Sequence, residues 1–102
     1  VRPMEMLLLG LGGCSSIDVM LILQKSRQQV TDCHVELSAE RASTDPKVFT
    51  EIHLHFVVSG KNLSSDKVER AINLSAEKYC SASIMLGQMA KVTHDFELVE
   101  TP

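Results

Sequence analysis

Residues 3–23 form a long, mostly apolar stretch, PMEMLLLGLGGCSSIDVMLIL, which limits the folds open to this chain. Its apolar residues recur on nearly every side of a helix, whereas a surface helix shows a single apolar stripe. A helix that is apolar all round has to be covered by other elements. We therefore expect a long, buried central helix, with the rest of the chain arranged to cover it.

Three other interpretations of this stretch are disfavoured. A membrane span would place Asp18 inside the bilayer, at a cost of about 2.5 to 3.5 kcal/mol, so we expect no membrane partner. A lipoprotein signal ending at Cys14 conflicts with Glu5, which is wrong for a positive leader, and with the apolar residues that follow. A dinucleotide fingerprint from Gly10 and Gly12 lacks both the third glycine and a preceding strand.

Composition narrows the class of protein further. The 102 residues, of which 44% are hydrophobic, are enough for one small domain spanning 1–102. The formal net charge is −3 and the ten basic residues are scattered, which argues against nucleic acid as a partner. Three cysteines without a convincing export signal indicate free thiols in a reducing compartment, so we expect a cytoplasmic protein.

The remaining sequence predicts an α+β order of helix, strand, strand, helix, strand. Residues 33–41 and 48–59 alternate with period two and are separated by turn residues, which predicts an antiparallel hairpin. A second helix is expected from Asp66 to about Cys80, capped by Asp66 or a preceding serine, with a short helical segment at 83–89. Residues 90–99 alternate again. Because three strands cover only one side of the central helix, we expect missing sequence or a second copy of the chain.

Cys14 and Cys80 are the candidate reactive pair. Cys14 lies in the central helix beside two glycines, and Cys80 ends the second helix among small residues. Two thiols on separate elements can face each other and close a disulfide, although free cysteines are more often small buried hydrophobes. The latter is our interpretation of Cys33. Burial would raise the pKa of Cys14, so reactivity would need a cation nearby, held by a carboxylate such as Glu5. By spacing alone, Glu5 is better explained as a first-turn acid.

The histidines suggest a metal site only under an assumed register. Pairing Arg41 with Val48 would place four possible ligands on the outer face of the hairpin: His34, Glu36, His53 and His55. Outer strand faces are normally solvated, and no HExxH or CxxC spacing is present. We therefore expect no metal site.

Four segments in order along the chain resemble the OsmC/Ohr family, and most closely its YhfA-like branch. They are PMEML at 3–7, GGC at 12–14 followed by Asp18 and Val19, VFTEI at 48–52, and AEKYCSAS at 76–83. The resemblance implies the OsmC-like fold, an intertwined homodimer whose long central helix carries the first cysteine. It also implies reduction of organic hydroperoxides in oxidative stress defence, with no cofactor and with an external dithiol as reductant.

Carried over to this sequence, the resemblance gives three residues a role. Cys14 would be the peroxidatic cysteine, Cys80 the resolving cysteine, and Glu5 the carboxylate that orients an arginine beside the first sulfur. The implied mechanism passes through a Cys14 sulfenic acid and a Cys14–Cys80 disulfide.

Two departures from the family pattern suggest an alternative function. The family arginine belongs to N-terminal strands that we expect to be missing from this chain, and Arg2 does not match its position. Ser81 also stands where active relatives commonly have proline. The alternative is a non-catalytic dimeric module that senses redox state or binds a small apolar ligand with the same thiols.

Overall fold

The apolar stretch forms one continuous helix, α1 (Pro3–Lys25), in the computed structural model, which describes residues 3–101. The predicted central helix is therefore confirmed. It ends where Arg27 adopts a left-handed conformation with φ of 61°. The backbone N–H groups of Ser26 and Gln28 then donate to the carbonyl oxygens of Ile22 and Leu23, each at 3.0 Å, which satisfies the last turn.

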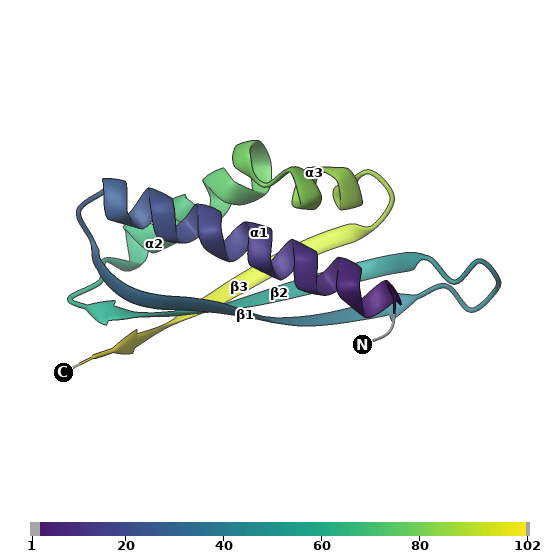
Figure 1. Ribbon diagram of the computed structural model, residues 1–102, viewed down its shortest axis with the longest axis horizontal. Helices are drawn as coiled ribbons and strands as arrows, with labels where there is room; N and C mark the ends of the chain where they lie inside the picture. The colour runs from purple at the N-terminus through teal and green to yellow at the C-terminus, as the bar shows by residue number, and fades with distance from the viewer. Residues whose placement is uncertain (1–2, 102) are drawn as a thin grey trace.

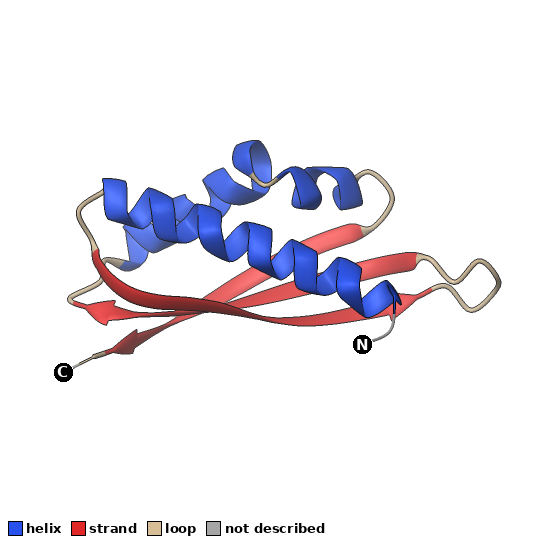
Figure 2. Cartoon of the chain, viewed as in Figure 1, coloured by secondary structure: helices blue, strands red, loops and turns tan. Residues whose placement is uncertain are grey.

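A three-stranded sheet in the order β1-β2-β3 lies against this helix (Figures 1 and 2). The strands are β1 (Gln29–Arg41), β2 (Phe49–Lys61) and β3 (Lys91–Glu100). The predicted antiparallel hairpin of β1 and β2 is confirmed, whereas β3 pairs with β2 in parallel. A parallel neighbour needs a long crossover, and the helices after β2 supply it.

The register of the hairpin differs from the one assumed from the sequence. Glu36 lies opposite His55 and Ser38 opposite His53, a shift of two residues from the assumed pairing. One residue of this shift arises because Arg41 pairs with Phe49 rather than Val48, and the other arises from the irregularity between Glu40 and Arg41. Because the shift is even, the side chains keep their predicted faces, but the assumed register that placed His34 opposite His55 and Glu36 opposite His53 is wrong.

The predicted second helix is divided into two parts, and the separately predicted short helix at 83–89 begins two residues earlier, at Ser81. The second helix comprises α2 (Ser65–Leu74) and a π-helical turn η1 (Ser75–Tyr79), and the short helix is α3 (Ser81–Gly87). Ser64 caps α2, since its Oγ accepts from the Lys67 N–H at 3.4 Å. Cys80 interrupts the helical path with φ −84° and ψ 99°. The change of helix type therefore occurs next to one of the two candidate cysteines.

All the helices lie on one face of the sheet, and the core lies between these two layers (Figure 1). Inward positions of β2 are buried as predicted, namely Ile52, Leu54, Phe56 and Val58. On α1, the buried positions are Leu11, Gly12, Ser15, Val19 and Leu23.

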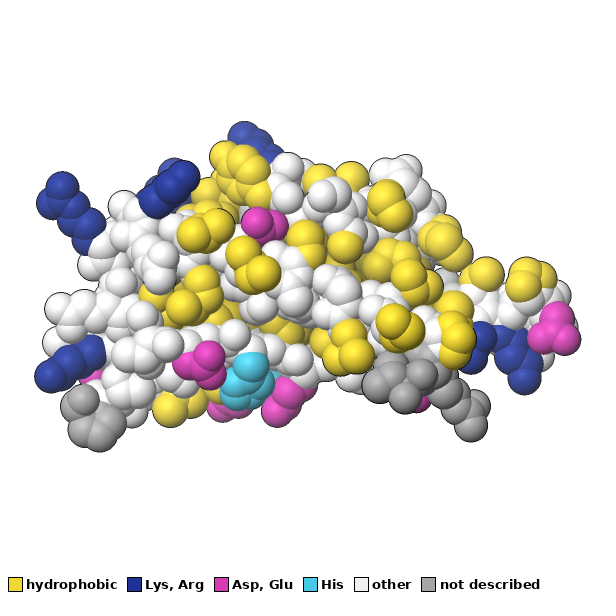
Figure 3. Space-filling model, viewed as in Figure 1, with side chains coloured by type: hydrophobic (Ala, Val, Ile, Leu, Met, Phe, Trp, Pro, Cys, Tyr) yellow, Lys and Arg dark blue, Asp and Glu magenta, His cyan; other side chains and the backbone are white. Residues whose placement is uncertain are grey.

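The opposite side of α1 is not covered within the described residues 3–101. Met6, Leu9 and Ile17 are about 60% exposed, and Leu21 is 51% exposed. Figure 3 shows hydrophobic side chains gathered along this side of the molecule. The expectation of a helix buried all round is therefore met on one side only, and the other side is an apolar surface.

By length and composition alone, α1 could cross a membrane, a property that it shares with core helices of soluble proteins. In this fold it packs along the sheet and supplies Leu11, Val19 and Leu23 to the hydrophobic core. Packing against the sheet therefore explains the apolar residues on one side of α1, and the exposed apolar side is not covered by residues 3–101.

The two glycines Gly60 and Gly87 give a matched test of the packing. A Cβ at Gly60 would meet the backbone oxygen of Gln29 and the side chain of Leu63, whereas a Cβ at Gly87 meets nothing within 4 Å. We expect Gly60→Ala to lower the free energy of unfolding by about 1 to 3 kcal/mol. Gly87→Ala should change it by less than about 1 kcal/mol. Urea denaturation of both variants measures the difference, and equal stabilities would contradict the packing described.

Candidate functional site

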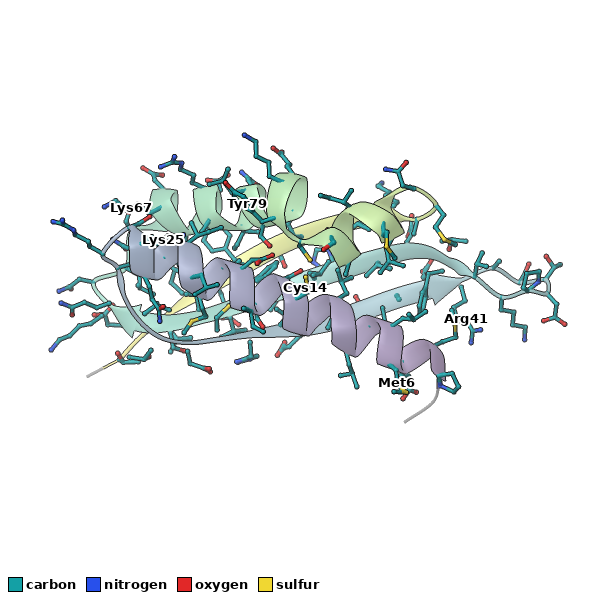
Figure 4. All side chains as sticks on the ribbon, turned by 45° about the horizontal axis from the view of Figure 1, so that its top comes forward. Met6, Cys14, Lys25, Arg41, Lys67 and Tyr79 are labelled. Carbon is teal, nitrogen blue, oxygen red and sulfur yellow. The ribbon has the colours of Figure 1, made fainter. Side chains whose placement is uncertain are left out.

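The structure brings Cys14 and Cys80 into direct contact. Their Sγ atoms lie 3.0 Å apart, although the residues are 66 positions apart in the sequence. Cys14 is half-buried midway along α1, between Met6 and Lys25 (Figure 4), and Cys80 is fully buried. Packing of α1 against η1 and α3 therefore places both sulfurs at one point in the core.

The local fold holds the Cys80 sulfur in place. The Cys80 N–H donates to the Ser75 carbonyl oxygen at 2.8 Å, which fixes the backbone at the end of η1. The Cys80 Sγ then caps α3 by accepting from the Ser83 N–H at 3.4 Å. The buried Ser15 Oγ lies 3.4 Å from the same sulfur. These contacts leave the sulfur oriented toward α1.

Asp18 is a third member of this cluster. One of its carboxylate oxygens, the Cys14 Sγ and the Cys80 Sγ all lie within 4.8 Å of one another. The Oδ2 atom is buried and has no hydrogen-bond partner among the described residues. Asp18 is not among the site residues predicted from the sequence, although an i, i+4 spacing from Cys14 puts it on the same helix face. That spacing is the signal that could have found it.

These neighbours raise the pKa of Cys14 above its ordinary value of 9.0. The largest cause is the hydrogen bond with the Cys80 thiol, followed by burial. Coulomb repulsion from Cys80 and Asp18 raises the pKa of Cys14 further. The backbone N–H of Ala82 acts in the opposite direction. Within the described residues, the site therefore favours the thiol of Cys14 over the thiolate, as the sequence predicts for a buried cysteine without a cation.

A surface hollow of about 420 Å³ extends from Asp18 along the ends of α1 and α2. Its walls are largely apolar, with Tyr79 at the end of η1 and two basic side chains, Lys25 and Arg70. Neither basic group comes within 4.0 Å of the Asp18 carboxylate in residues 3–101. Asp18 lines this hollow and also belongs to the thiol cluster, whereas Cys14 and Cys80 do not line the hollow.

Glu5 lies in the first turn of α1, nine residues before Cys14 and therefore about 13 Å away along the helix axis. It lines a separate hollow of about 510 Å³ together with Arg41 and Phe49. Arg2, which the sequence comparison also considered, is outside the described residues. A role of Glu5 in orienting a cation stays a prediction.

The remaining cysteine is part of the packing. Cys33 lies on the inner face of β1 against the hydrophobic core, and burial raises its pKa to about 11. This agrees with its interpretation as a core residue.

The histidines of β2 contact β3 rather than β1. His53 Nε2 and His55 Nδ1 lie 3.0 Å and 2.7 Å from the Asp95 Oδ1, and His55 Nε2 lies 3.0 Å from the Glu97 Oε1. His53 Nδ1 also lies 2.7 Å from the Thr93 Oγ1. The ring nitrogens are thus already partnered, which explains the outer face of the sheet as a network of hydrogen bonds.

Comparison with known proteins gives consistent matches over nearly the whole chain. The OsmC-like protein family matches residues 1–95. Protein YhfA of Escherichia coli K12 is 54% identical over 97 residues, covering 95% of this chain and 72% of YhfA. The crystal structure of a hypothetical protein from Aquifex aeolicus VF5 is 34% identical with a TM-score of 0.94, covering 100% of this chain and 76% of that one.

A more distant structure shares the fold. An organic hydroperoxide resistance protein OsmC from Legionella pneumophila is 16% identical with a TM-score of 0.77, covering 95% of this chain and 69% of that one.

The hydrogen bonds on the outer face of the sheet predict how the pKa of His55 changes when its partners are replaced. Hydrogen bonds to Glu97 and then to Asp95 raise its pKa above 6.5. We expect Glu97→Gln to lower the pKa of His55 more than Asp95→Asn does, measured by NMR titration of the ring, with the His94 signal on the inner face as internal control. The raised pKa stabilises the fold fully below pH 6.5, and this contribution is lost as pH rises through the folded value. Unchanged titration in both variants would contradict the network.

Proposed function

This chain belongs to the OsmC-like protein family, as the family resemblance of the sequence predicted, and we propose that it reduces organic hydroperoxides with Cys14 and Cys80. The expected OsmC-like α+β fold is confirmed by the same comparisons. The observation that carries the proposal is the 3.0 Å separation of the two Sγ atoms. The name of the Legionella protein, an organic hydroperoxide resistance protein, supports this class of substrate.

The proposed reaction begins at Cys14. Its thiolate attacks the terminal oxygen of the hydroperoxide, the O–O bond breaks, and the alkoxide leaves and takes a proton to become an alcohol. Cys14 is oxidised to a sulfenic acid. The Cys80 sulfur then attacks the Cys14 sulfur, water leaves, and a Cys14–Cys80 disulfide forms. An external dithiol reduces this disulfide by exchange and returns both thiols.

The geometry suits the second step of this sequence. A disulfide bond is about 2.05 Å long, so the two sulfurs need to approach by about 1 Å from their present separation. Cys80 follows directly on the π-helical turn η1, where the helical path already changes. The movement is therefore within the range of side-chain rotation and a small local adjustment.

The hollow beside Asp18 favours an organic peroxide, rather than an inorganic one, as the substrate. Leu21, Ile22 and Leu74 contribute apolar walls that an alkyl group can contact, and Tyr79 extends them toward solvent. We propose that the substrate enters here with its peroxide group directed toward the thiols.

Formation of the Cys14 thiolate is the difficult step in this proposal. The pKa of Cys14 is raised by Cys80, burial and Asp18, so a cation beside the sulfur would accelerate the attack. The family resemblance assigns that role to an arginine oriented by Glu5. The raised pKa also supports a second candidate function, a slow redox sensor that forms the same disulfide without turnover.

We further propose that the working protein is a homodimer in the cytoplasm. The exposed apolar side of α1, including Leu9, Ile17 and Leu21, is unusual for a monomer and is typical of an interface. A two-fold arrangement would pack this side of α1 against its copy and complete the burial that the sequence predicts.

Peroxide treatment of the reduced protein tests the thiol chemistry. We expect cumene hydroperoxide to oxidise two of the three thiols and to form the Cys14–Cys80 disulfide, detected by mass spectrometry of peptides. Because the pKa of Cys14 is raised above 9.0, the rate should climb steadily with pH through the neutral range. With dithiothreitol present, peroxide should be consumed over many turnovers.

Cysteine variants provide the controls for this reaction. Cys14→Ser should abolish peroxide consumption, Cys80→Ser should stop at a sulfenic acid that dimedone traps, and Cys33→Ser should behave as wild type. Equal consumption by wild type and Cys14→Ser would rule out the enzyme. Disulfide formation without repeated turnover would favour the redox sensor.

An acidic substitution on α1 tests the homodimer. Ile17→Glu places a charge in the exposed apolar side of α1, so we expect it to shift the protein from dimer to monomer in sedimentation velocity. Val99→Glu makes the same kind of change at an exposed residue of β3, away from α1, and should leave the dimer intact. A monomeric wild type would refute the arrangement.

A further inference from the structure

The thiol cluster contains three groups that are all acids and no base. Cys14 and Asp18 come from α1 and Cys80 from the break between η1 and α3, and their ligand atoms lie within 4.8 Å of one another. In the described residues 3–101, no lysine or arginine forms an ion pair with the Asp18 carboxylate. A buried carboxylate oxygen without a partner is costly, and Asp18 Oδ2 is such an atom. Within residues 3–101, the cluster therefore has no positive charge paired with Asp18.

We propose that Cys14, Asp18 and Cys80 form a three-ligand site for Zn²⁺ in the reduced protein. Two cysteine sulfurs and a carboxylate oxygen are ligands that Zn²⁺ takes in proteins, whereas Mg²⁺ and Ca²⁺ prefer oxygen alone. This site is independent of whether the thiols turn over peroxide.

The distances fit such an ion after a small adjustment. Two Zn–S bonds of about 2.3 Å at a tetrahedral angle hold the sulfurs about 3.8 Å apart. The present separation is 3.0 Å, so the sulfurs move apart by less than about 1 Å, and Cys14 is only half-buried. The Asp18 oxygen already lies within 4.8 Å of both sulfurs. Each thiol releases its proton to solvent as its bond to the metal forms.

The fourth position of the ion remains open to a small molecule. Asp18 is both a ligand and a wall residue of the hollow of about 420 Å³, so water or another small ligand can reach the metal from that side. Three protein ligands and one open position are the usual arrangement of accessible zinc sites, whereas closed structural sites have four protein ligands.

Binding of Zn²⁺ opposes disulfide formation at the same residues. The metal occupies the sulfur lone pair that would attack a peroxide, and it holds the two sulfurs farther apart than a disulfide allows. The site would therefore exist in two exclusive states, a metal-bound reduced state and a disulfide. Zinc availability would then set how readily the thiols are oxidised.

Metal titration of the reduced, metal-free protein tests the site directly. We use Cd²⁺ alone, because its thiolate charge-transfer absorption reports only sulfur ligands and ignores the His53 and His55 surface, and then Zn²⁺ alone against a chromophoric chelator. We expect one ion per chain. Asp18→Asn should weaken binding by more than about tenfold, since even the outer partners of a metal ligand contribute about 10- to 100-fold. Cys14→Ser and Cys80→Ser should weaken it further.

Cys33→Ser is the matched control and should bind as wild type does. No binding by wild type, or equal binding by wild type and Asp18→Asn, would overturn the three-ligand site. Cd²⁺ binding and thiolate absorption as strong in Cys14→Ser as in wild type would do the same. Circular dichroism of each variant confirms that it is folded. Disulfide formation is measured separately in the metal-free Asp18→Asn variant. This measurement distinguishes a failure of the metal site from a failure of the peroxide chemistry.

Discussion

Packing of α1 along one face of the sheet is the constraint on which the rest of the structure depends. It buries Leu11, Val19 and Leu23, and Gly12 allows the helix to approach β1 so closely that a Cβ there would meet Leu37 at 2.8 Å. This contact fixes the rotation of α1 about its axis. The rotation in turn directs Cys14 toward η1 and α3 and leaves an apolar side of the same helix exposed.

Much of this fold follows from local patterns in the sequence. Apolar residues on all sides predict α1, and period-two alternation predicts all three strands and the inward face of β2. Two features could not be predicted in the same way. The parallel direction of β3 depends on how far the crossover helices carry the chain. The hairpin register depends on the pairing of Arg41 with Phe49 and on the irregularity beside it, which together shift the register by two residues and so keep the same side chains facing inward.

In the site, too, some features follow from local sequence spacing and others depend on packing between distant segments. Contact between Cys14 and Cys80 depends on packing between segments 66 residues apart, so spacing alone leaves it open and only the family resemblance pairs them. Asp18 was within reach of sequence reasoning, because its position one turn after Cys14 places it on the same face. In the sequence its carboxylate argues against a membrane span, and in the fold the same carboxylate acts on a neighbouring thiol.

The negative charge of Asp18 can be offset by either of two kinds of cation, and these would affect Cys14 differently. A guanidinium beside Cys14 would offset the carboxylate, lower the pKa of the thiol and leave the sulfur lone pair free to attack a peroxide. A zinc ion would offset the same charge but would bind that lone pair itself. Both solve the electrostatic problem of a buried acid next to two thiols, and they have opposite effects on reactivity. The identity of the cation, more than the distance between the sulfurs, would therefore determine whether this pair acts as a peroxidase or is held reduced.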